Sequence, residues 1–248
     1  MRHILITGAS GGIAQAMVPL LTDDFLILLG RDAQKIEELY ASYPKKAIYE
    51  IDISKAADLA ALVKKIYQDY GKIDVLVNNA GYAIYDDFEN FSEEQVRAMF
   101  DVNLFALMAL CRLVGKEMKT AKAGHIINIV SMSGKIASAK SSRYSATKFA
   151  ALGFSNTIRL ELAPYNVAVT TVNPGPVATG FFDLADPDGS YQKSVQAFMI
   201  SPEKVASKIV QSMGTKKREI NLPWLLEATN KFYTLFPNLA DFLARKGF

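Results

Sequence analysis

A tyrosine and a lysine stand one helical turn apart, at Tyr144 and Lys148, in the stretch YSATK. Residues at i and i+4 share one face of a helix, so their side chains can act together. The pKa of a free tyrosine is about 10, which makes its phenol a poor proton carrier at neutral pH. A neighbouring lysine ammonium favours the phenolate and lowers that pKa. The pair therefore predicts proton exchange with an alcohol or a carbonyl oxygen.

A serine, Ser131, directly follows the apolar run His125–Val130, which we expect to be a buried strand. Ligands of open α/β sheets bind outside the carboxyl ends of the strands. A hydroxyl there can hydrogen-bond a substrate oxygen beside the phenol of Tyr144. The alternative interpretation is structural, with Ser131 starting a helix and Tyr144 packing in the core. The two histidines, His3 and His125, lie at strand starts, which argues against a Ser-His-Asp hydrolase.

A glycine cluster, Gly8, Gly11 and Gly12, separates the first apolar run from the first helical pattern. Glycine permits positive φ and close approach to a ligand, and the following helix start directs free N–H groups at an anion such as a pyrophosphate. The spacing differs from G-x-G-x-x-G, because Ala14 occupies the last small position. We expect its methyl group to displace the helix or cofactor slightly. Taken alone, the cluster fits a plain tight turn equally well.

The second apolar run, Phe25–Leu29, ends in Gly30-Arg31 and has no acid at its tip. Asp32 comes one residue later, where it suits a helix cap. An acid at the tip would hold the ribose 2′-hydroxyl of NAD, whereas an arginine can pair with the 2′-phosphate of NADP. Arg31 therefore favours NADP(H) over NAD(H); the alternative is that Arg31 is a solvated loop residue.

Short apolar runs and longer helical patterns alternate along the chain. The expected strands are His3–Thr7, Phe25–Leu29, Ala47–Ile51, Val75–Val77, His125–Val130, Val167–Val172 and Glu219–Leu222. The expected helices are Ile13–Leu21, Ala33–Tyr40, Lys55–Tyr70, Glu93–Lys119, Tyr144–Ala163 and Pro202–Met213. This alternation predicts a Rossmann-type, doubly wound parallel sheet of about seven strands with helices on both faces, in one domain over residues 1–248.

Composition excludes several classes of protein. The net charge of +3, from 28 basic and 25 acidic residues, is too small to indicate nucleic-acid binding. The single cysteine, Cys111, excludes an internal disulfide and is expected to be a buried hydrophobe. We expect no metal site, no leader segment and no apolar stretch of membrane-spanning length, and therefore a cytoplasmic protein.

These pieces together resemble a short-chain dehydrogenase/reductase of the single-domain type with a Tyr-x-x-x-Lys active site. The matching residues, in family order over about Met1 to Thr179, are Thr7-Gly8-Ala9-Ser10-Gly11-Gly12-Ile13, Asp52-Ile53, Asn78-Asn79-Ala80-Gly81, Asn103, Ser131, Tyr144, Lys148 and Asn173-Pro174-Gly175-Pro176-Val177-Ala178-Thr179. The resemblance implies hydride transfer between a nicotinamide and a carbonyl or alcohol, with a homodimer or homotetramer as the assembly.

The resemblance also implies roles. Tyr144 would be the general acid/base, Lys148 would lower its pKa and bind the nicotinamide ribose, Ser131 would polarise the substrate carbonyl, and Asn103 would bind a relay water. The cofactor would be contacted by Gly8, Ser10, Gly11, Gly12, Ile13, Arg31, Asp52, Ile53, Asn79, Ala80, Gly81, Tyr144, Lys148, Pro174, Gly175, Val177 and Thr179. The alternative function is a non-catalytic NADP(H)-binding redox sensor, although such proteins usually lose the tyrosine or lysine.

Two segments lie outside this match. We expect residues 179–200 to be an irregular lid loop, whose apolar side chains predict a moderately hydrophobic ketone, aldehyde or alcohol as substrate. These side chains are Phe181, Phe182, Leu184, Tyr191, Phe198 and Met199. The apolar tail 224–248, interrupted by Pro237, could cover the substrate entrance, meet another subunit or lie on a membrane surface, and the last is not favoured.

The helical run Leu104–Cys111 is apolar on every face, and the stretch Phe149–Leu162 is similar. A helix of that kind is expected to be buried all round. Because a sheet covers one side only, a second subunit is expected to cover the other.

Overall fold

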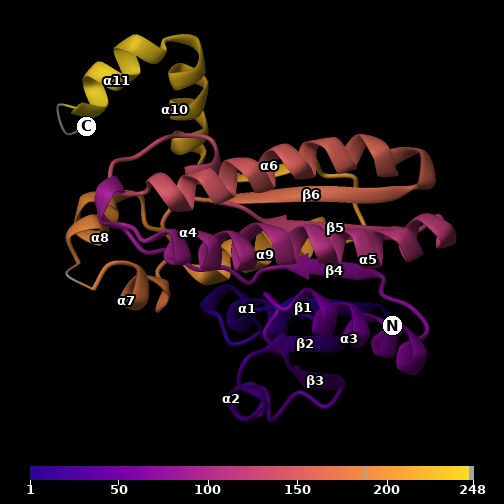
Figure 1. The fold of residues 1–248 in the computed structure, drawn as a ribbon. Helices are drawn as coiled ribbons and strands as arrows, with labels where there is room; N and C mark the ends of the chain where they lie inside the picture. Colours follow the sequence, from indigo (N-terminus) through magenta and orange to yellow (C-terminus); the bar gives the residue numbers. More distant parts are fainter. Residues whose placement is uncertain (188, 246–248) are drawn as a thin grey trace.

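The computed structural model describes residues 1–187 and 189–245. Among them, seven parallel strands form one sheet in the order β3-β2-β1-β4-β5-β6-β7 (Figure 1). The strands are β1 (His3–Thr7), β2 (Phe25–Gly30), β3 (Lys46–Glu50), β4 (Val75–Asn78), β5 (Gly124–Ile129), β6 (Val167–Pro174) and β7 (Glu219–Leu222). The expected doubly wound fold is confirmed, with strand ends shifted by at most two residues.

Helices cover both faces of the sheet. The first face carries α1 (Gly12–Met17), α2 (Ala33–Leu39) and α9 (Pro202–Ser212). The second carries α3 (Ala56–Tyr70), α5 (Ala106–Ala121) and α6 (Ser142–Leu162). Side chains of a strand alternate between faces, so Ile4 and Ile6 join the first core while Leu5 joins the second.

The long helical pattern from Glu93 is one continuous helix with a change of winding. It consists of α4 (Glu93–Phe100), a π-helical stretch (Asp101–Phe105) and α5. A capping box starts it: Gln95 N donates to Ser92 Oγ and Ser92 N donates to Gln95 Oε1, both at 3.2 Å. The π-helical stretch places Asn103 on the side facing α6.

The expectation that no apolar stretch reaches membrane-spanning length was wrong. The continuous helix Glu93–Ala121 contains an 18-residue window with a mean hydropathy of 1.6, which is long and apolar enough to cross a membrane. Half of that window is buried, and α5 packs on β4, β5 and α3. The helix therefore serves as a core element of the described fold, and its apolar character reflects burial against the sheet.

In the single chain the sheet covers one side of this helix only, as expected. Phe105 is 54% exposed and Met108 is 36% exposed, and on α6 Phe149 is 46% exposed. The sheet covers only the opposite side of α5 and α6. These exposed apolar side chains are consistent with the proposed second subunit.

Residues 179–200 were expected to be irregular, and this was wrong. They contain α7 (Phe181–Ala185), α8 (Ser190–Val195) and a 3-10 turn (Gln196–Phe198). The carboxylate of Asp186 accepts hydrogen bonds from the N–H groups of Tyr191 and Gln192, which stabilises the start of α8. Buried Phe182 attaches α7 to the body.

The tail forms a helical hairpin of α10 (Trp224–Leu235) and α11 (Pro237–Arg245) outside the sheet layers (Figure 1). The interruption at Pro237 is confirmed, since proline at the first position of α11 needs no N–H partner. Inside the body, Cys111 is buried as expected and contacts Asn78.

A buried polar chain connects the central strands to α6. Asn78 Nδ2 on β4 donates to Asn128 Oδ1 on β5, and Asn128 Nδ2 donates to Ser155 Oγ on α6, both at 2.8 Å. Ser155 Oγ donates in turn to the Ala151 carbonyl at 2.6 Å. All these side chains are buried, so each bond replaces water that the core excludes.

Replacement Asn128→Ala is therefore expected to lower the free energy of unfolding by about 2–4 kcal/mol, because it leaves buried partners unsatisfied and opens a cavity. Urea denaturation measures this. Thr157→Ala is the control, since Thr157 is exposed and bonds only its own helix; a similar loss in both variants would contradict the role of the chain.

Candidate functional site

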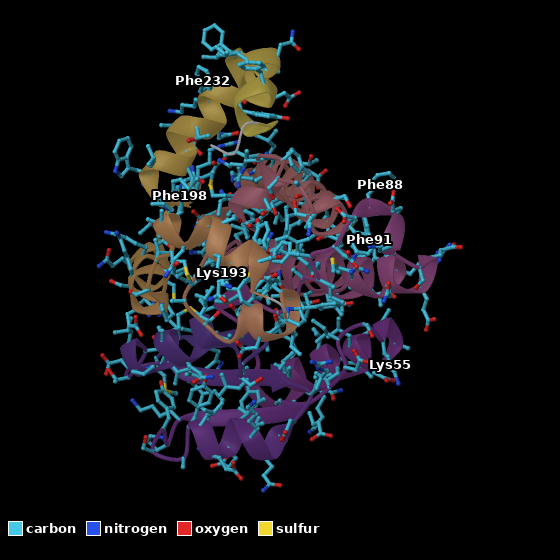
Figure 2. All side chains as sticks on the ribbon, turned by 90° about the vertical axis from the view of Figure 1, so that its left-hand side faces the viewer. Lys55, Phe88, Phe91, Lys193, Phe198 and Phe232 are labelled. Carbon is cyan, nitrogen blue, oxygen red and sulfur yellow. The ribbon has the colours of Figure 1, made fainter. Side chains whose placement is uncertain are left out.

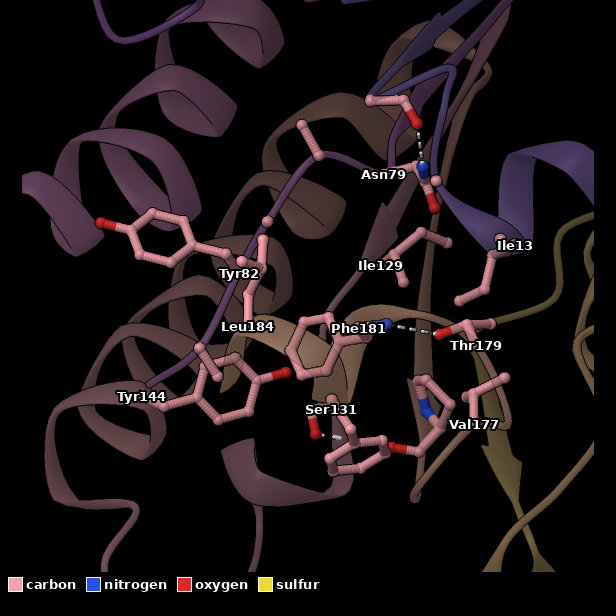
Figure 3. Close-up of a pocket in the computed structure, with 18 of the residues that line it drawn as sticks. Ile13, Asn79, Tyr82, Ile129, Ser131, Tyr144, Val177, Thr179, Phe181 and Leu184 are labelled. Carbon is pink, nitrogen blue, oxygen red and sulfur yellow. Dashed lines mark hydrogen bonds between the residues drawn. The ribbon is translucent and has the colours of Figure 1, made fainter. Parts of the chain in front are cut away.

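A cavity of about 1450 Å³ lies at the carboxyl ends of the strands (Figure 3). It brings together all but one of the expected site residues, from the loops after six strands, β1 to β6, and from the helices α1 and α6. The expected lining residues present are Gly8, Ser10, Gly11, Gly12, Ile13, Arg31, Asp52, Ile53, Asn79, Ala80, Gly81, Ser131, Tyr144, Lys148, Pro174, Gly175, Val177 and Thr179. Asn103 does not line it.

The glycines of the turn after β1 allow neighbouring segments to approach it closely. Gly8 has φ +63°, and a Cβ there would clash with the Ala80 Cα atom at 2.8 Å. A Cβ on Gly12 would clash with Thr179 Cγ2 at 2.5 Å. Ala14, where the usual motif has a glycine, is fully buried in the core and does not line the cavity.

Hydrogen bonds join the glycine turn to the end of β4. Thr7 Oγ1 accepts from the N–H groups of Asn79 and Ala80, each at 3.0 Å. Asn79 Nδ2 donates to the carbonyls of Thr7 and Gly8, also at 3.0 Å. The segment Asn79-Ala80-Gly81 therefore supports the turn as well as lining the cavity.

Polar residues after β2 and β3 line the other end of the cavity. Arg31 is exposed there, whereas Asp32 caps α2 by accepting from Lys35 N at 2.8 Å, as expected from its position. Asp52 Oδ1 accepts from the Ser54 hydroxyl at 2.7 Å and from Ser54 N at 3.0 Å. These bonds hold the pKa of Asp52 below its ordinary value, with Arg31 contributing a smaller effect.

Ser131, Tyr144 and Lys148 converge at the inner end of the cavity. Ser131 caps a 3-10 turn: its Oγ accepts from Ser133 N at 3.0 Å and donates to the Pro174 carbonyl at 3.4 Å. Lys148 Nζ lies 5.7 Å from the centre of the Tyr144 ring and donates to the Ile129 carbonyl at 3.1 Å. The i,i+4 spacing on α6 therefore brings the side chains together as the sequence predicts.

Burial dominates the electrostatics of this group. It raises the pKa of Tyr144, an effect that the nearby Ser131 hydroxyl opposes, and it lowers the pKa of Lys148 to about 8. The expectation of a lowered tyrosine pKa is thus not met in the protein alone. Desolvation outweighs a lysine that is 5.7 Å from the ring centre.

Asn103 lies behind the cavity wall. Its Oδ1 accepts from Tyr82 N at 3.0 Å, and its Nδ2 donates to the Tyr82 carbonyl at 2.9 Å and to Thr147 Oγ1 at 3.2 Å. The side chain thereby fastens the segment after β4 to α6. Gly81 lies directly in front of it, because a Cβ there would be 3.1 Å from Asn103 Oδ1 and 3.5 Å from Lys148 Nζ.

Sequence reasoning missed the aromatic residues that follow β4. Tyr85 stacks on Tyr191 of α8 with ring centres 3.8 Å apart, and its ring meets that of Tyr144 edge-on at 6.0 Å. Five of the six expected lid residues line the cavity; Met199 does not. The sequence position of Tyr82 and Tyr85 could have indicated them, since both follow Asn79-Ala80-Gly81 at the carboxyl end of a strand.

The buried lysine makes stability depend on pH. The pKa of Lys148 is about 8 in the folded chain against 10.5 for an ordinary lysine. Between these values the unfolded chain binds more protons, so this group's contribution to stability rises with pH. The free energy of unfolding of wild type should therefore rise relative to that of Lys148→Met from about pH 8 to pH 10.5. A difference in unfolding free energy between the two proteins that does not change with pH would contradict this expectation. Lys204→Met, at an exposed lysine, is the control.

Comparison with known proteins identifies the family. The short chain dehydrogenase family model matches residues 2–188. The 3-ketodihydrosphingosine reductase of Bacteroides thetaiotaomicron is 34% identical over 73% of this chain, which spans 65% of that relative's length. A short-chain dehydrogenase structure from Streptomyces avermitilis has a TM-score of 0.81, 25% identity and 97% coverage of both chains. A metagenomic short-chain oxidoreductase in complex with NADP has a TM-score of 0.75 and 28% identity, covering 89% of this chain and 96% of its own. The chain belongs to the short-chain dehydrogenase/reductase family of oxidoreductases.

Proposed function

We propose that this protein is an NADP(H)-dependent oxidoreductase that interconverts a moderately hydrophobic ketone or aldehyde and its alcohol, with Tyr144 as the acid/base. The observation that carries the proposal is the convergence of Ser131, Tyr144 and Lys148 in the cavity whose other end holds the glycine turn and Arg31. One continuous space thus joins a phosphate-binding turn to a proton-transfer group.

The residues of the cavity fit a dinucleotide. Gly8, Gly11 and Gly12 line the cavity with backbone and no side chain, and no acidic residue occupies the first turn of α1. The pyrophosphate would lie on this turn, the adenine ribose near Arg31 and Asp52, and the nicotinamide near Thr179. When bound, the nicotinamide supplies or accepts the hydride.

The chain's own residues would handle the proton and the substrate oxygen. The raised pKa of Tyr144 keeps its phenol protonated at neutral pH, which suits donation to a carbonyl oxygen as it gains charge. Ser131 lines the same cavity as that phenol and can hold the same oxygen. A protonated Lys148 would favour the phenolate that forms after transfer.

We propose that Asn103 acts mainly by holding neighbouring segments of the site in place. Its side-chain amide is used by Tyr82 and Thr147, so it holds Gly81 in place beside Lys148. The family resemblance also implies a water at Asn103, and we keep this water in the proposal. It would take part in a proton relay that runs through Lys148.

The substrate half of the cavity is apolar and aromatic. Its walls are Tyr85 after β4, Phe181 and Leu184 on α7, and Tyr191 on α8. In the close-up, Phe181 and Leu184 lie on the same side of the cavity as Tyr144 (Figure 3). These side chains support a hydrophobic carbonyl compound rather than a sugar phosphate.

Tyr144→Phe removes only the phenolic oxygen. We expect carbonyl-dependent oxidation of NADPH to fall by at least about a hundredfold, the usual contribution of a general acid, while NADPH affinity changes little. Steady-state kinetics and fluorescence titration measure the two quantities. Tyr165→Phe, outside the lining residues, is the control; retained turnover in Tyr144→Phe would show that another group moves the proton.

Arg31→Ala tests the cofactor. Loss of a charge-assisted pair with the 2′-phosphate should weaken NADPH binding by about 2 kcal/mol and leave NADH binding nearly unchanged. Arg97→Ala, which removes an exposed arginine paired with Glu93, is the matched control. Equal weakening of both cofactors by Arg31→Ala would place the 2′-phosphate elsewhere.

A further inference from the structure

The α10–α11 hairpin exposes more large apolar side chains than any other described part of the molecule. Its exposed members are Trp224 (75%), Leu225 (46%), Phe232 (37%), Leu235 (71%), Phe236 (54%), Leu239 (49%) and Phe242 (52%). No residue of α10 is fully buried, and α11 packs mainly on α10. Soluble proteins rarely expose contiguous apolar surface on this scale without a binding role.

The two faces of α10 differ in how much of them is exposed. Leu226, Asn230 and Tyr233, spaced at i, i+4 and i+7, are partly covered by the body. Trp224, Ala228, Phe232 and Leu235, spaced at i, i+4, i+8 and i+11, are exposed on the other side. The spacings place each set on one face of the helix. The apolar stripe of α10 therefore faces away from the protein.

The stripe continues into the second helix. The rings of Phe232 and Phe236 lie 5.4 Å apart across the end of α10, and Leu239 and Phe242 follow at i and i+3 on α11. Figure 2 shows Phe232 on the hairpin, away from Phe88 on the body. The two helices thus offer one extended apolar surface.

The hairpin adjoins the substrate cavity. Leu226, on the covered face of α10, lines the cavity, and so does Leu184 of α7, which is 74% exposed. The hairpin and the α7–α8 segment lie toward the same end of the molecule, where the strands of the sheet have their carboxyl ends (Figure 1). Apolar side chains therefore border the cavity from two separate elements.

A lysine beside the stripe favours an anionic partner. Glu227 points inward, where its carboxylate accepts from Lys135 Nζ at 3.2 Å beside Glu219. Lys231 is exposed on α10, one helical turn before Leu235 of the stripe. Asp241, on α11, is the exposed acid among the described residues of the hairpin. Trp and Phe beside a lysine with a flexible stem are typical of helices that lie in a membrane interface.

We propose that the α10–α11 hairpin docks the protein peripherally on an anionic lipid surface, with the cavity opening next to the bilayer. Trp224, Phe232, Leu235, Phe236 and Leu239 would enter the boundary between headgroups and acyl chains, while Lys231 pairs with lipid phosphates. A second copy of the chain is the alternative occupant of this surface, and the experiment below distinguishes the two.

Docking has a consequence that rests on the proposed function. A carbonyl substrate dissolved in the bilayer could enter the apolar cavity past Leu184 and Leu226 without crossing water. The substrate class would then be a membrane-partitioned ketone or aldehyde. Lipid binding itself requires neither cofactor nor turnover, so its test is independent of that function.

The sole tryptophan of the chain, Trp224, reports on the hairpin directly. Its emission in the full-length protein would be recorded with vesicles of phosphatidylcholine, alone and mixed with phosphatidylglycerol. We expect a blue shift and co-flotation with the mixed vesicles, and quenching by lipids brominated in the upper acyl chain. An unchanged emission in the presence of the mixed vesicles would overturn the proposal. A blue shift that appears without vesicles when the protein concentration is raised would also overturn the proposal, because it would assign the surface to a second copy.

Variants separate the apolar and the charged contributions. Leu235→Ser with Leu239→Ser should weaken vesicle binding by at least about tenfold. Phe88→Ser, at a residue that is 76% exposed on the body, should leave binding unchanged. Lys231→Gln should weaken binding to the mixed vesicles about fivefold and affect neutral vesicles little. Equal effects of the hairpin and Phe88 variants would overturn the assignment.

An activity assay separates lipid binding from the proposed function. The rate of NADPH oxidation with a water-soluble ketone should be the same in all these variants. If wild type itself shows no such oxidation, that result counts against the proposed function alone.

Discussion

The packing of α6 against β6 and against the 3-10 turn that follows β5 is the constraint on which the candidate site depends. It buries a tyrosine and a lysine on one helix face, directly beside the serine that caps this turn. Neither Tyr144 nor Lys148 would be stable there without compensation, since a buried ammonium costs free energy unless it is hydrogen-bonded. The Ile129 carbonyl provides one partner for Lys148, and the Asn78–Asn128–Ser155 chain holds the helix and strands together. These contacts therefore hold two buried polar side chains in place at the candidate site.

The remaining features of the site follow from the parallel sheet. Because the strands run in the same direction, the glycine turn after β1, the Asn79 segment after β4, Ser131 after β5 and Pro174 at the end of β6 all meet at one edge. Thr7 and Asn79 then lock the first two of these together. The lid and the hairpin come from segments beyond β6 and β7, where the chain is free to vary without disturbing the sheet.

Strand positions, the fold class and the membership of the site could be predicted from the sequence because they rest on local pattern. Buried strands show as short apolar runs, and Tyr144 and Lys148 show as an i,i+4 pair. Other features depended on distant contacts. The helices of the lid require Asp186 and the anchor Phe182, and the tyrosine pKa depends on how deeply α6 is buried. The exposure of Phe105 and Met108 likewise follows from which side of α5 the sheet covers.

Transfer of deuterium tests the central claim most directly, that this cavity reduces a carbonyl group at the expense of NADPH. NADPH deuterated at the nicotinamide C4 would be incubated with wild-type protein and a panel of hydrophobic ketones and aldehydes, and the products analysed by mass spectrometry. The account predicts an alcohol that carries the deuterium on its carbinol carbon, formed as NADPH absorbance falls. Tight binding of NADPH without a deuterated alcohol from any of the compounds would contradict it and would favour a redox sensor.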